Sequence, residues 1–179
     1  MKSYRYKERR NMMIRRIAFG VGEVAVAIIL GFFVIHFAFQ TVTVHGESMQ
    51  PSYNDQDVVL VNKLEYRIGD PKALDVVVLE LENGTTAHYT VKRVIGLPGQ
   101  TVQITDGDIL IDGKKLDIEF EEEILSAGLA AYSIELGEDE YFVIGDNCNN
   151  SEDSRVSNIG NIKRSQFVGK VMGVVKKGR

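Results

Sequence analysis

The segment HYTVKRVIGL, residues 88–97, has the composition of a β-strand. It is rich in Val, Ile and Tyr, which favour strands, and it ends at the turn Pro98-Gly99. Two adjacent cations, Lys92 and Arg93, interrupt its apolar run. Because side chains alternate along a strand, these two must point to opposite faces. One of them therefore faces away from solvent, unless the strand lies at the edge of a sheet.

Six further segments on both sides of this strand are rich in the same residue types and are bounded by Gly, Asn, Asp or Pro. They are VVLVNKL (58–64), DVVVLEL (75–81), TVQI (101–104), DILIDG (108–113), YFVIGD (141–146) and FVGKVMGVV (167–175). The pairs Asn83-Gly84, Asp106-Gly107 and Asp112-Gly113 predict tight turns, and DILIDGKKL predicts a hairpin. Only FEEEILSAGLA, within residues 120–130, suggests a short helix. The pattern predicts a mainly β domain, built from antiparallel sheets around one core.

The segment that precedes these strands is long and apolar. Residues 17–39, IAFGVGEVAVAIILGFFVIHFAF, contain only Glu23 and His36 as ionisable groups. As a helix they extend about 34 Å, enough to cross a hydrocarbon core of about 30 Å. A buried core helix of this kind needs a larger domain to cover it, and a cleaved secretory signal is shorter and ends in an A-x-A site. We therefore expect an uncleaved transmembrane anchor.

Charge is distributed unevenly along the chain. Seven of the 21 Lys and Arg residues precede residue 17. The part of the chain after the anchor contains the other 14, together with 23 of the 25 Asp and Glu residues, so its formal net charge is about −9. By the positive-inside rule, residues 1–16 are expected in the cytoplasm, 17–39 in the membrane and 40–179 on the extracytoplasmic side. An acidic domain argues against nucleic acid as a partner.

Cysteine and histidine are too sparse for a disulfide framework or a metal centre. Cys148 is the only cysteine, and His36, His45 and His88 lack metal-ligand spacing. We expect neither a bound metal nor a cofactor.

Four polar segments lie between the apolar ones. They are GESMQPSYNDQDVVLVNKL (46–64), RIGDPKALDVVV (67–78), HYTVKRVIGLPG (88–99) and GDNCNNSEDSRVSNIG (145–160). Taken singly, each has an ordinary structural interpretation. Ser48 is a serine in a turn, Lys92 can run its stem along the sheet with its ammonium group in water, and the last segment can be a solvated loop with an exposed Asp–Arg pair.

Together and in this order, the four segments resemble the type I signal peptidases (leader peptidases), in their short, single-span branch. The stretches that carry the resemblance are GESMQPS, RIGDPKALDVV, YTVKRVIGLPG and GDNCNNSEDSR, and it extends from the anchor to about Gly173. It implies a signal-peptidase-like fold of two antiparallel β-sheet regions, in which an apolar surface meets the membrane. It also implies a membrane-bound serine endopeptidase that cleaves signal peptides from exported preproteins after small residues at −1 and −3. Preproteins, the lipid bilayer and a nearby secretion translocon are the partners that the resemblance implies.

The resemblance also implies roles for single residues. Ser48 matches the nucleophile, Lys92 the general base and Ser151 a hydroxyl that orients the base. Three residues match positions that hold the site together, namely Asp146, Asp153 and Arg155. Four match positions that line the −1 and −3 pockets, namely Val42, Val44, Tyr53 and Val91.

Two positions depart from the family pattern. Some relatives carry a serine that helps to bind the oxyanion two residues before the nucleophile, where this chain has Gly46. A backbone N–H would then be the second oxyanion donor, beside that of Ser48. Cys148 stands at a variable position of the last motif, and we assign it no catalytic role.

A lysine can act as a base only if its pKa is lowered. Near pH 7.5 a lysine with an ordinary pKa of about 10.4 is neutral in about one molecule in a thousand. Burial disfavours the ammonium form, and the apolar strand around Lys92 is suited to this. His88 lies on the same strand face, but its offset of four residues places it about 13 Å away along the strand.

Three other classes remain open on the residues alone. A self-cleaving repressor-type protease also uses serine and lysine on a β-fold, but the anchor and the acidic domain argue against it. A non-catalytic anchored β-domain has no need of Ser48, Lys92 and Ser151 together. A sortase-type transpeptidase would need Cys148 with a histidine, and both His45 and His88 lie in unsuitable contexts.

Overall fold

The computed structural model describes residues 2–83 and 86–178, in two compact units, Met1–Ala38 and Phe39–Arg179. The first unit is a single helix, α1 (Lys2–Ala38). Its stretch Arg16–Ala38 is the one part of the described chain that is long and apolar enough to cross a membrane. The helix ends at Ala38, and Phe39, the last residue of the predicted anchor, already begins a strand.

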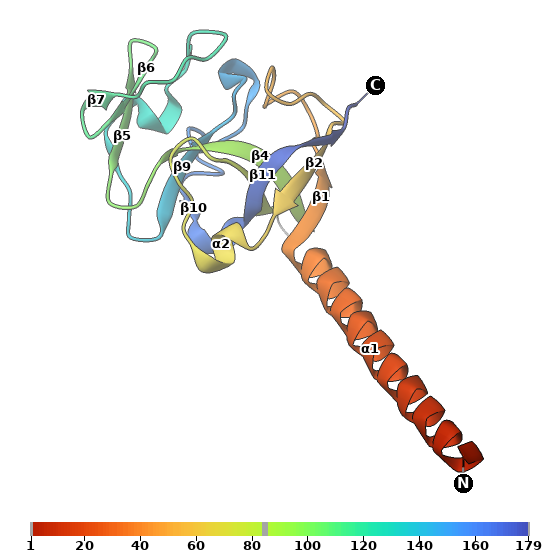
Figure 1. Ribbon diagram of the computed structural model, residues 1–179. Helices are drawn as coiled ribbons and strands as arrows, with labels where there is room; N and C mark the ends of the chain where they lie inside the picture. Colours follow the sequence, from red (N-terminus) through yellow and green to blue (C-terminus); the bar gives the residue numbers. More distant parts are fainter. Residues whose placement is uncertain (1, 84–85, 179) are drawn as a thin grey trace. The chain divides into compact units, whose positions relative to one another are not determined.

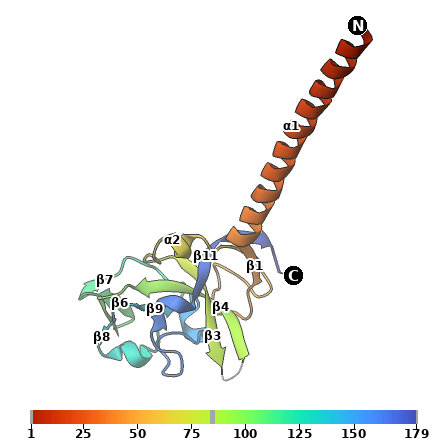
Figure 2. The ribbon, with the colours of Figure 1, turned by 90° about the horizontal axis from the view of Figure 1, so that it is seen from below.

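The larger sheet of the second unit has seven strands in the order β1-β2-β11-β3-β4-β9-β10, and every neighbouring pair is antiparallel. Figure 2 shows its longest pair, β3 and β4, side by side. The strands are β1 (Phe39–Thr43), β2 (Val58–Asn62), β3 (Val76–Asn83), β4 (Thr86–Gly96), β9 (Glu140–Ile144), β10 (Ile162–Lys163) and β11 (Phe167–Lys176).

A second, antiparallel sheet of four strands lies between β4 and β9 in the chain. Its strands, in the order β7-β6-β5-β8, are β5 (Thr101–Thr105), β6 (Asp108–Ile111), β7 (Lys114–Lys115) and β8 (Ile134–Glu135). Figure 1 shows β5, β6 and β7 gathered away from β1 and β2. Asp112 and Gly113 both have positive φ in the turn between β6 and β7, which confirms the predicted hairpin. Of the other predicted turns, Asn83-Gly84 lies partly outside the described residues.

Helical structure in this unit is limited to short turns. They are α2 (Glu65–Ile68) and the 3₁₀ turns η1 (Gly128–Ala131), η2 (Cys148–Asn150) and η3 (Arg164–Gln166). The helix expected within residues 120–130 is thus reduced to the single turn η1 at its end.

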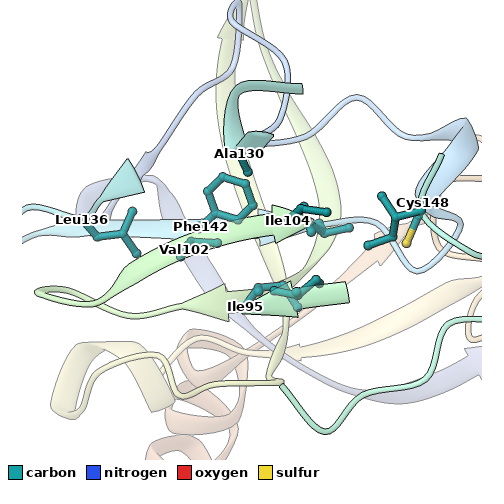
Figure 3. Packing of buried hydrophobic residues seen from close by; sticks show 10 residues of the cluster. Ile95, Val102, Ile104, Ala130, Leu136, Phe142 and Cys148 are labelled. Atoms are coloured by element: carbon teal, nitrogen blue, oxygen red, sulfur yellow. The ribbon is translucent and has the colours of Figure 1, made fainter. Parts of the chain in front are cut away.

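The described residues form three buried apolar clusters, the first of which joins the two sheets. The first packs the four-stranded sheet against β9, and Figure 3 shows Phe142 in its middle, with Leu136 toward one end and Cys148 toward the other. The second contains Val42, Val44 and Val91, from β1, the segment after it and β4. The third contains Val77 and Val94, from β3 and β4. The predicted fold class is confirmed: mostly antiparallel β-sheet with one N-terminal apolar helix.

Candidate active site

Ser48 lies in a tight turn between β1 and β2. Met49 anchors this turn because its side chain is fully buried, and its carbonyl accepts a hydrogen bond from the N–H of Tyr53 at 2.8 Å. Gly46 begins the turn with φ of +81°, in the left-handed region that glycine adopts at no steric cost. Its N–H donates to Asp55 Oδ1 at 2.8 Å. The turn thus leaves the Ser48 side chain half-buried at the end of the sheet.

Lys92 reaches this hydroxyl from β4. Its Nζ donates to Ser48 Oγ at 2.9 Å, although the two residues are 44 positions apart in sequence. Lys92 lies opposite Val77 on β3 and is only 4% exposed. Val94 lies two residues after Lys92 on β4, and both Val77 and Val94 belong to the third cluster. The stem of Lys92 therefore lies on the same apolar face of the strand as Val94. The interpretation of Lys92 as a solvated lysine is therefore wrong.

The electrostatic surroundings of Lys92 favour its neutral form. Burial lowers the pKa of Lys92, an effect that Asp153 and Glu152 partly oppose. Asp153 is already bound to Arg155, which itself disfavours a second positive charge nearby. Among the described residues, no carboxylate forms an ion pair with Lys92.

Gly145, which follows β9, allows two backbone segments to approach each other. A Cβ atom at this position would lie 2.3 Å from Ser151 Oγ and 2.4 Å from the carbonyl oxygen of Ser48. These two atoms are therefore close neighbours. The same carbonyl accepts a hydrogen bond from the N–H of Asn147 at 3.0 Å, which joins the Ser48 turn to the loop after β9. Sequence reasoning noted Gly145 only as part of a motif and missed its steric role.

Ser151 brings a second hydroxyl to this region. Its Oγ is buried and has no hydrogen-bond partner among the described residues. A buried hydroxyl without a partner costs free energy, so an unpaired one beside reactive groups is a feature of functional sites. In the described part of the chain, Ser151 Oγ and Lys92 Nζ do not form a hydrogen bond. The role of Ser151 as the group that orients the base therefore stays a prediction.

The loop after β9 is fixed by two ion pairs. Arg93 Nε and Nη2 donate to Asp146 Oδ1 and Oδ2 at 2.7 and 2.6 Å. Arg155 Nε and Nη2 donate to Asp153 Oδ1 and Oδ2, both at 2.8 Å. Both pairs are bidentate, the geometry in which a guanidinium group binds a carboxylate most strongly.

The second of these pairs is buried, so the expectation of an exposed Asp–Arg pair in a solvated loop is wrong. Asp153 Oδ2 also accepts the N–H of Gly145 at 3.1 Å, and Arg155 Nη1 donates to the carbonyl of Ser126 at 3.1 Å. These bonds satisfy the charges that burial removes from water. Arg93 was noted in the sequence only as a neighbour of Lys92, and its pairing with Asp146 was not foreseen.

The four predicted pocket residues come together. Val42, Val44 and Val91 are buried in the second cluster, and Tyr53 packs against it. The cluster also contains Met49, next to the proposed nucleophile.

Cys148 is part of the protein core. Its side chain is buried in the first cluster rather than exposed in a polar loop, and its Sγ donates to the carbonyl of Gly145 at 3.5 Å. Burial raises the pKa of the Cys148 thiol to about 12, so it stays protonated near neutral pH. His88 is exposed on β4. Within the described residues, no three His, Cys, Asp or Glu side chains are grouped so as to hold a metal ion.

Comparisons with known proteins identify the family. The family described as "Signal peptidase, peptidase S26" matches residues 17–175. Signal peptidase I P of Bacillus subtilis subsp. natto is 37% identical over 157 residues, which cover 83% of each chain. Signal peptidase I T of Bacillus subtilis (strain 168) is 37% identical over 156 residues, which cover 82% of this chain and 78% of that one. A solved signal peptidase I of Enterococcus faecalis V583 is 28% identical, with a TM-score of 0.44, and the match covers 60% of this chain and 98% of that one. The chain belongs to the signal peptidase family of S26 peptidases.

Proposed function

We propose that this signal peptidase cleaves preproteins with Ser48 as nucleophile and Lys92 as general base. The observation that carries the proposal is the hydrogen bond of 2.9 Å between Lys92 Nζ and Ser48 Oγ, made by a lysine that is almost completely buried. A serine hydroxyl needs an adjacent base before it can attack a carbonyl carbon, and a lysine needs a lowered pKa before it can accept the proton. Both conditions meet at this pair.

The reaction follows from these groups. Ser48 Oγ attacks the carbonyl carbon of the scissile bond as Lys92 Nζ accepts its proton, and Lys92 then gives that proton to the leaving amine. This leaves the signal peptide as an ester on Ser48. A water molecule, deprotonated by Lys92, then hydrolyses the ester. The Ser48 N–H, which donates to no acceptor among the described residues, can bind the developing oxyanion. The Gly46 N–H is bound to Asp55, so the Gly46 amide is not a free second donor.

The neighbouring polar groups support the pair in our proposal. Ser151 Oγ, buried and without a partner, accepts a hydrogen bond from Lys92 when substrate binding brings the groups together. Asp146, Asp153 and Arg155 fix the loop that carries Ser151, through the bidentate bonds described above.

The specificity is for small residues at −1 and −3. Val42, Val44 and Val91 are branched aliphatic residues with little exposed surface, and Tyr53 packs beside them, so the site can offer only shallow apolar hollows. We propose that the preprotein lies extended along a strand edge with alanine preferred at both positions. The apolar helix α1 anchors the enzyme in the cell membrane, with the domain extracytoplasmic and close to the translocon that delivers its substrates.

Incubation of the purified full chain with a preprotein tests this function. We expect one cut, after a small residue, with wild-type protein. Ser48→Ala and Lys92→Arg should both abolish it, because a guanidinium group keeps the charge but does not deprotonate in this pH range. Circular dichroism controls for folding of the variants. Substantial cleavage by folded Lys92→Arg would contradict the role of Lys92, and efficient cleavage after leucine or lysine at −1 would contradict the specificity.

A further inference from the structure

A cavity adjoins the loop that follows β9. It has a volume of about 490 Å³ and lies between the segment 125–129 and the segment 148–157, where Leu125, Leu129, Ser151, Arg155 and Val156 are among its lining residues. Pockets that bind small ligands or side chains have volumes of about 300–1,000 Å³. The cavity is therefore large enough to receive at least one side chain of a bound peptide.

Apolar side chains at this cavity remain exposed to solvent. Leu125 is 81% exposed, Leu129 44% and Val156 38%. Grouped apolar side chains on a protein surface commonly mark a site of interaction. Contact with an apolar partner would remove their surface from water, which is favourable.

The charge inside the cavity is not free to bind a ligand. Arg155 lines it, but its guanidinium donates to both carboxylate oxygens of Asp153 and to the carbonyls of Ser126 and Cys148. An acidic ligand would have to compete with these bonds. The cavity is therefore suited to an apolar side chain rather than to an anion.

Ser151 connects this cavity to the proposed catalytic pair. Ser151 lines the cavity. Its Oγ and the carbonyl oxygen of Ser48 both lie next to Gly145, so the two atoms are close to each other. The four residues proposed to contact −1 and −3 belong to a different cluster, and none of them lines this cavity. A substrate whose −1 and −3 side chains contact that cluster and whose scissile carbonyl meets Ser48 can extend past Ser151 with the residues that follow the bond.

We propose that this cavity is a subsite for an apolar side chain near the start of the mature protein, within the first four residues after the cleaved bond. An extended chain advances about 3.3 Å per residue, so those residues cover the distance across a neighbouring cavity of this size. The inference rests on the proposed function, since it takes Ser48 as the point of attack. It adds a preference downstream of the bond to the preference for small residues upstream of it.

Matched peptide substrates test this subsite on the full-length enzyme. The peptides share one signal-peptide cleavage site and differ only in carrying Leu or Ser at +1, +2, +3 or +4. We expect kcat/KM to be higher for Leu at one of these positions by roughly three- to tenfold, because burial of a leucine side chain is partial in an open cavity. Leu125→Ser and Leu129→Ser should each reduce that ratio, and the double variant should bring it close to one. Ile68→Ser is the matched control, since Ile68 is 86% exposed and does not line the cavity.

The ratio separates failure of the subsite from failure of the proposed function. If wild type cuts both peptides and Lys92→Arg cuts neither, the proposed function stands whatever the ratio. An unchanged leucine preference in the double variant would then overturn the subsite. So would the absence of a leucine preference at all four positions in the wild-type enzyme.

Discussion

Lys92 and Arg93 are adjacent cations whose surroundings differ. Arg93 forms a bidentate pair with Asp146, and this hydrogen bonding raises the pKa of Arg93 above its ordinary value. Lys92 is more deeply buried, and the carboxylate that most strongly supports its charge, Asp153, is already bound to Arg155. One cation is therefore held charged and the other is made easy to deprotonate. Strand alternation separates the two, because it sends adjacent side chains to opposite faces of β4.

The rate of peptide cleavage should depend on the protonation of Lys92. Below its lowered pKa the lysine is charged and cannot accept the Ser48 proton, so kcat/KM should rise with pH with an apparent pKa below the ordinary value of about 10.4. Glu152 supports the charged form, so Glu152→Gln should move this profile to lower pH. The exposed Glu138→Gln serves as the control. A rate that levels off only near the ordinary lysine pKa would show that Lys92 is not the titrating base.

The same burial should reduce the stability of the fold. Because the pKa of Lys92 is lower in the folded state, the unfolded state binds more protons between the two pKa values, and stability rises with pH across that window. Lys92→Met removes the buried charge and keeps an unbranched side chain. At pH 7 we expect the Tm of Lys92→Met to be higher than that of the wild type. The difference between the two Tm values should decrease as the pH approaches about 10.4. Differential scanning calorimetry at several pH values measures both Tm values. Equal Tm values of wild type and Lys92→Met at pH 7 would contradict the inference that burial of the Lys92 charge destabilises the fold.

At the scale of elements, three segments that are far apart in sequence form the candidate site. The turn at Ser48 follows β1, Lys92 is on β4, and the loop from Gly145 to Arg155 follows β9. In the larger sheet, β4 and β9 are neighbours, so the sheet order brings Lys92 and the loop together. Asn147 then joins that loop to the Ser48 turn by a backbone hydrogen bond.

Sequence patterns could predict the strands but not all of these contacts. Each of the seven predicted strand segments contains a strand, because composition and turn residues are local signals. The pairing of Arg93 with Asp146 spans 53 residues and depends on the register of β4 against β9, for which local sequence has no signal. For the same reason Cys148 was placed in a polar loop: its neighbours in sequence are polar, whereas its neighbours in space are the apolar side chains of the first cluster.

Gly145 gives a test at this scale. A methyl group there would overlap Ser151 Oγ and the Ser48 carbonyl, and since the carbonyl belongs to the backbone, the turn itself has to move. A displacement of about 1 Å can reduce a rate about a hundredfold, so we expect Gly145→Ala to lose activity on that order in kcat. Gly137→Ala is a suitable control, because a Cβ at Gly137 meets only ordinary contacts with Glu140 at 3.4 Å or more. Activity of Gly145→Ala within a few fold of wild type, in folded protein, would contradict the close approach.

At the scale of the whole molecule, two units of opposite charge are joined at residues 38 and 39. The first carries six cations before the 23-residue stretch Arg16–Ala38, and Arg16 at the start of that stretch is the seventh. The second is acidic and contains every residue proposed for catalysis. A helix of that length suits one crossing of a bilayer, and cations on one flank favour the cytoplasmic side for that flank.

The orientation of the chain is therefore a prediction that a topology experiment can test. We expect protease added to intact protoplasts to digest the region 40–179 while the N-terminal segment stays protected, because seven cations before the apolar stretch oppose its translocation. Replacing Arg9, Arg10, Arg15 and Arg16 by Gln should weaken that bias and protect a fraction of the domain. A matched variant with Lys114, Lys115, Lys176 and Lys177 changed to Gln alters charge by the same amount at positions distant in sequence from the apolar stretch, and it should keep the wild-type pattern. Complete protection of the wild-type domain until the membrane is opened would reverse the assignment. The proposed catalytic pair would then face the cytoplasm, where signal peptides have not yet crossed the membrane.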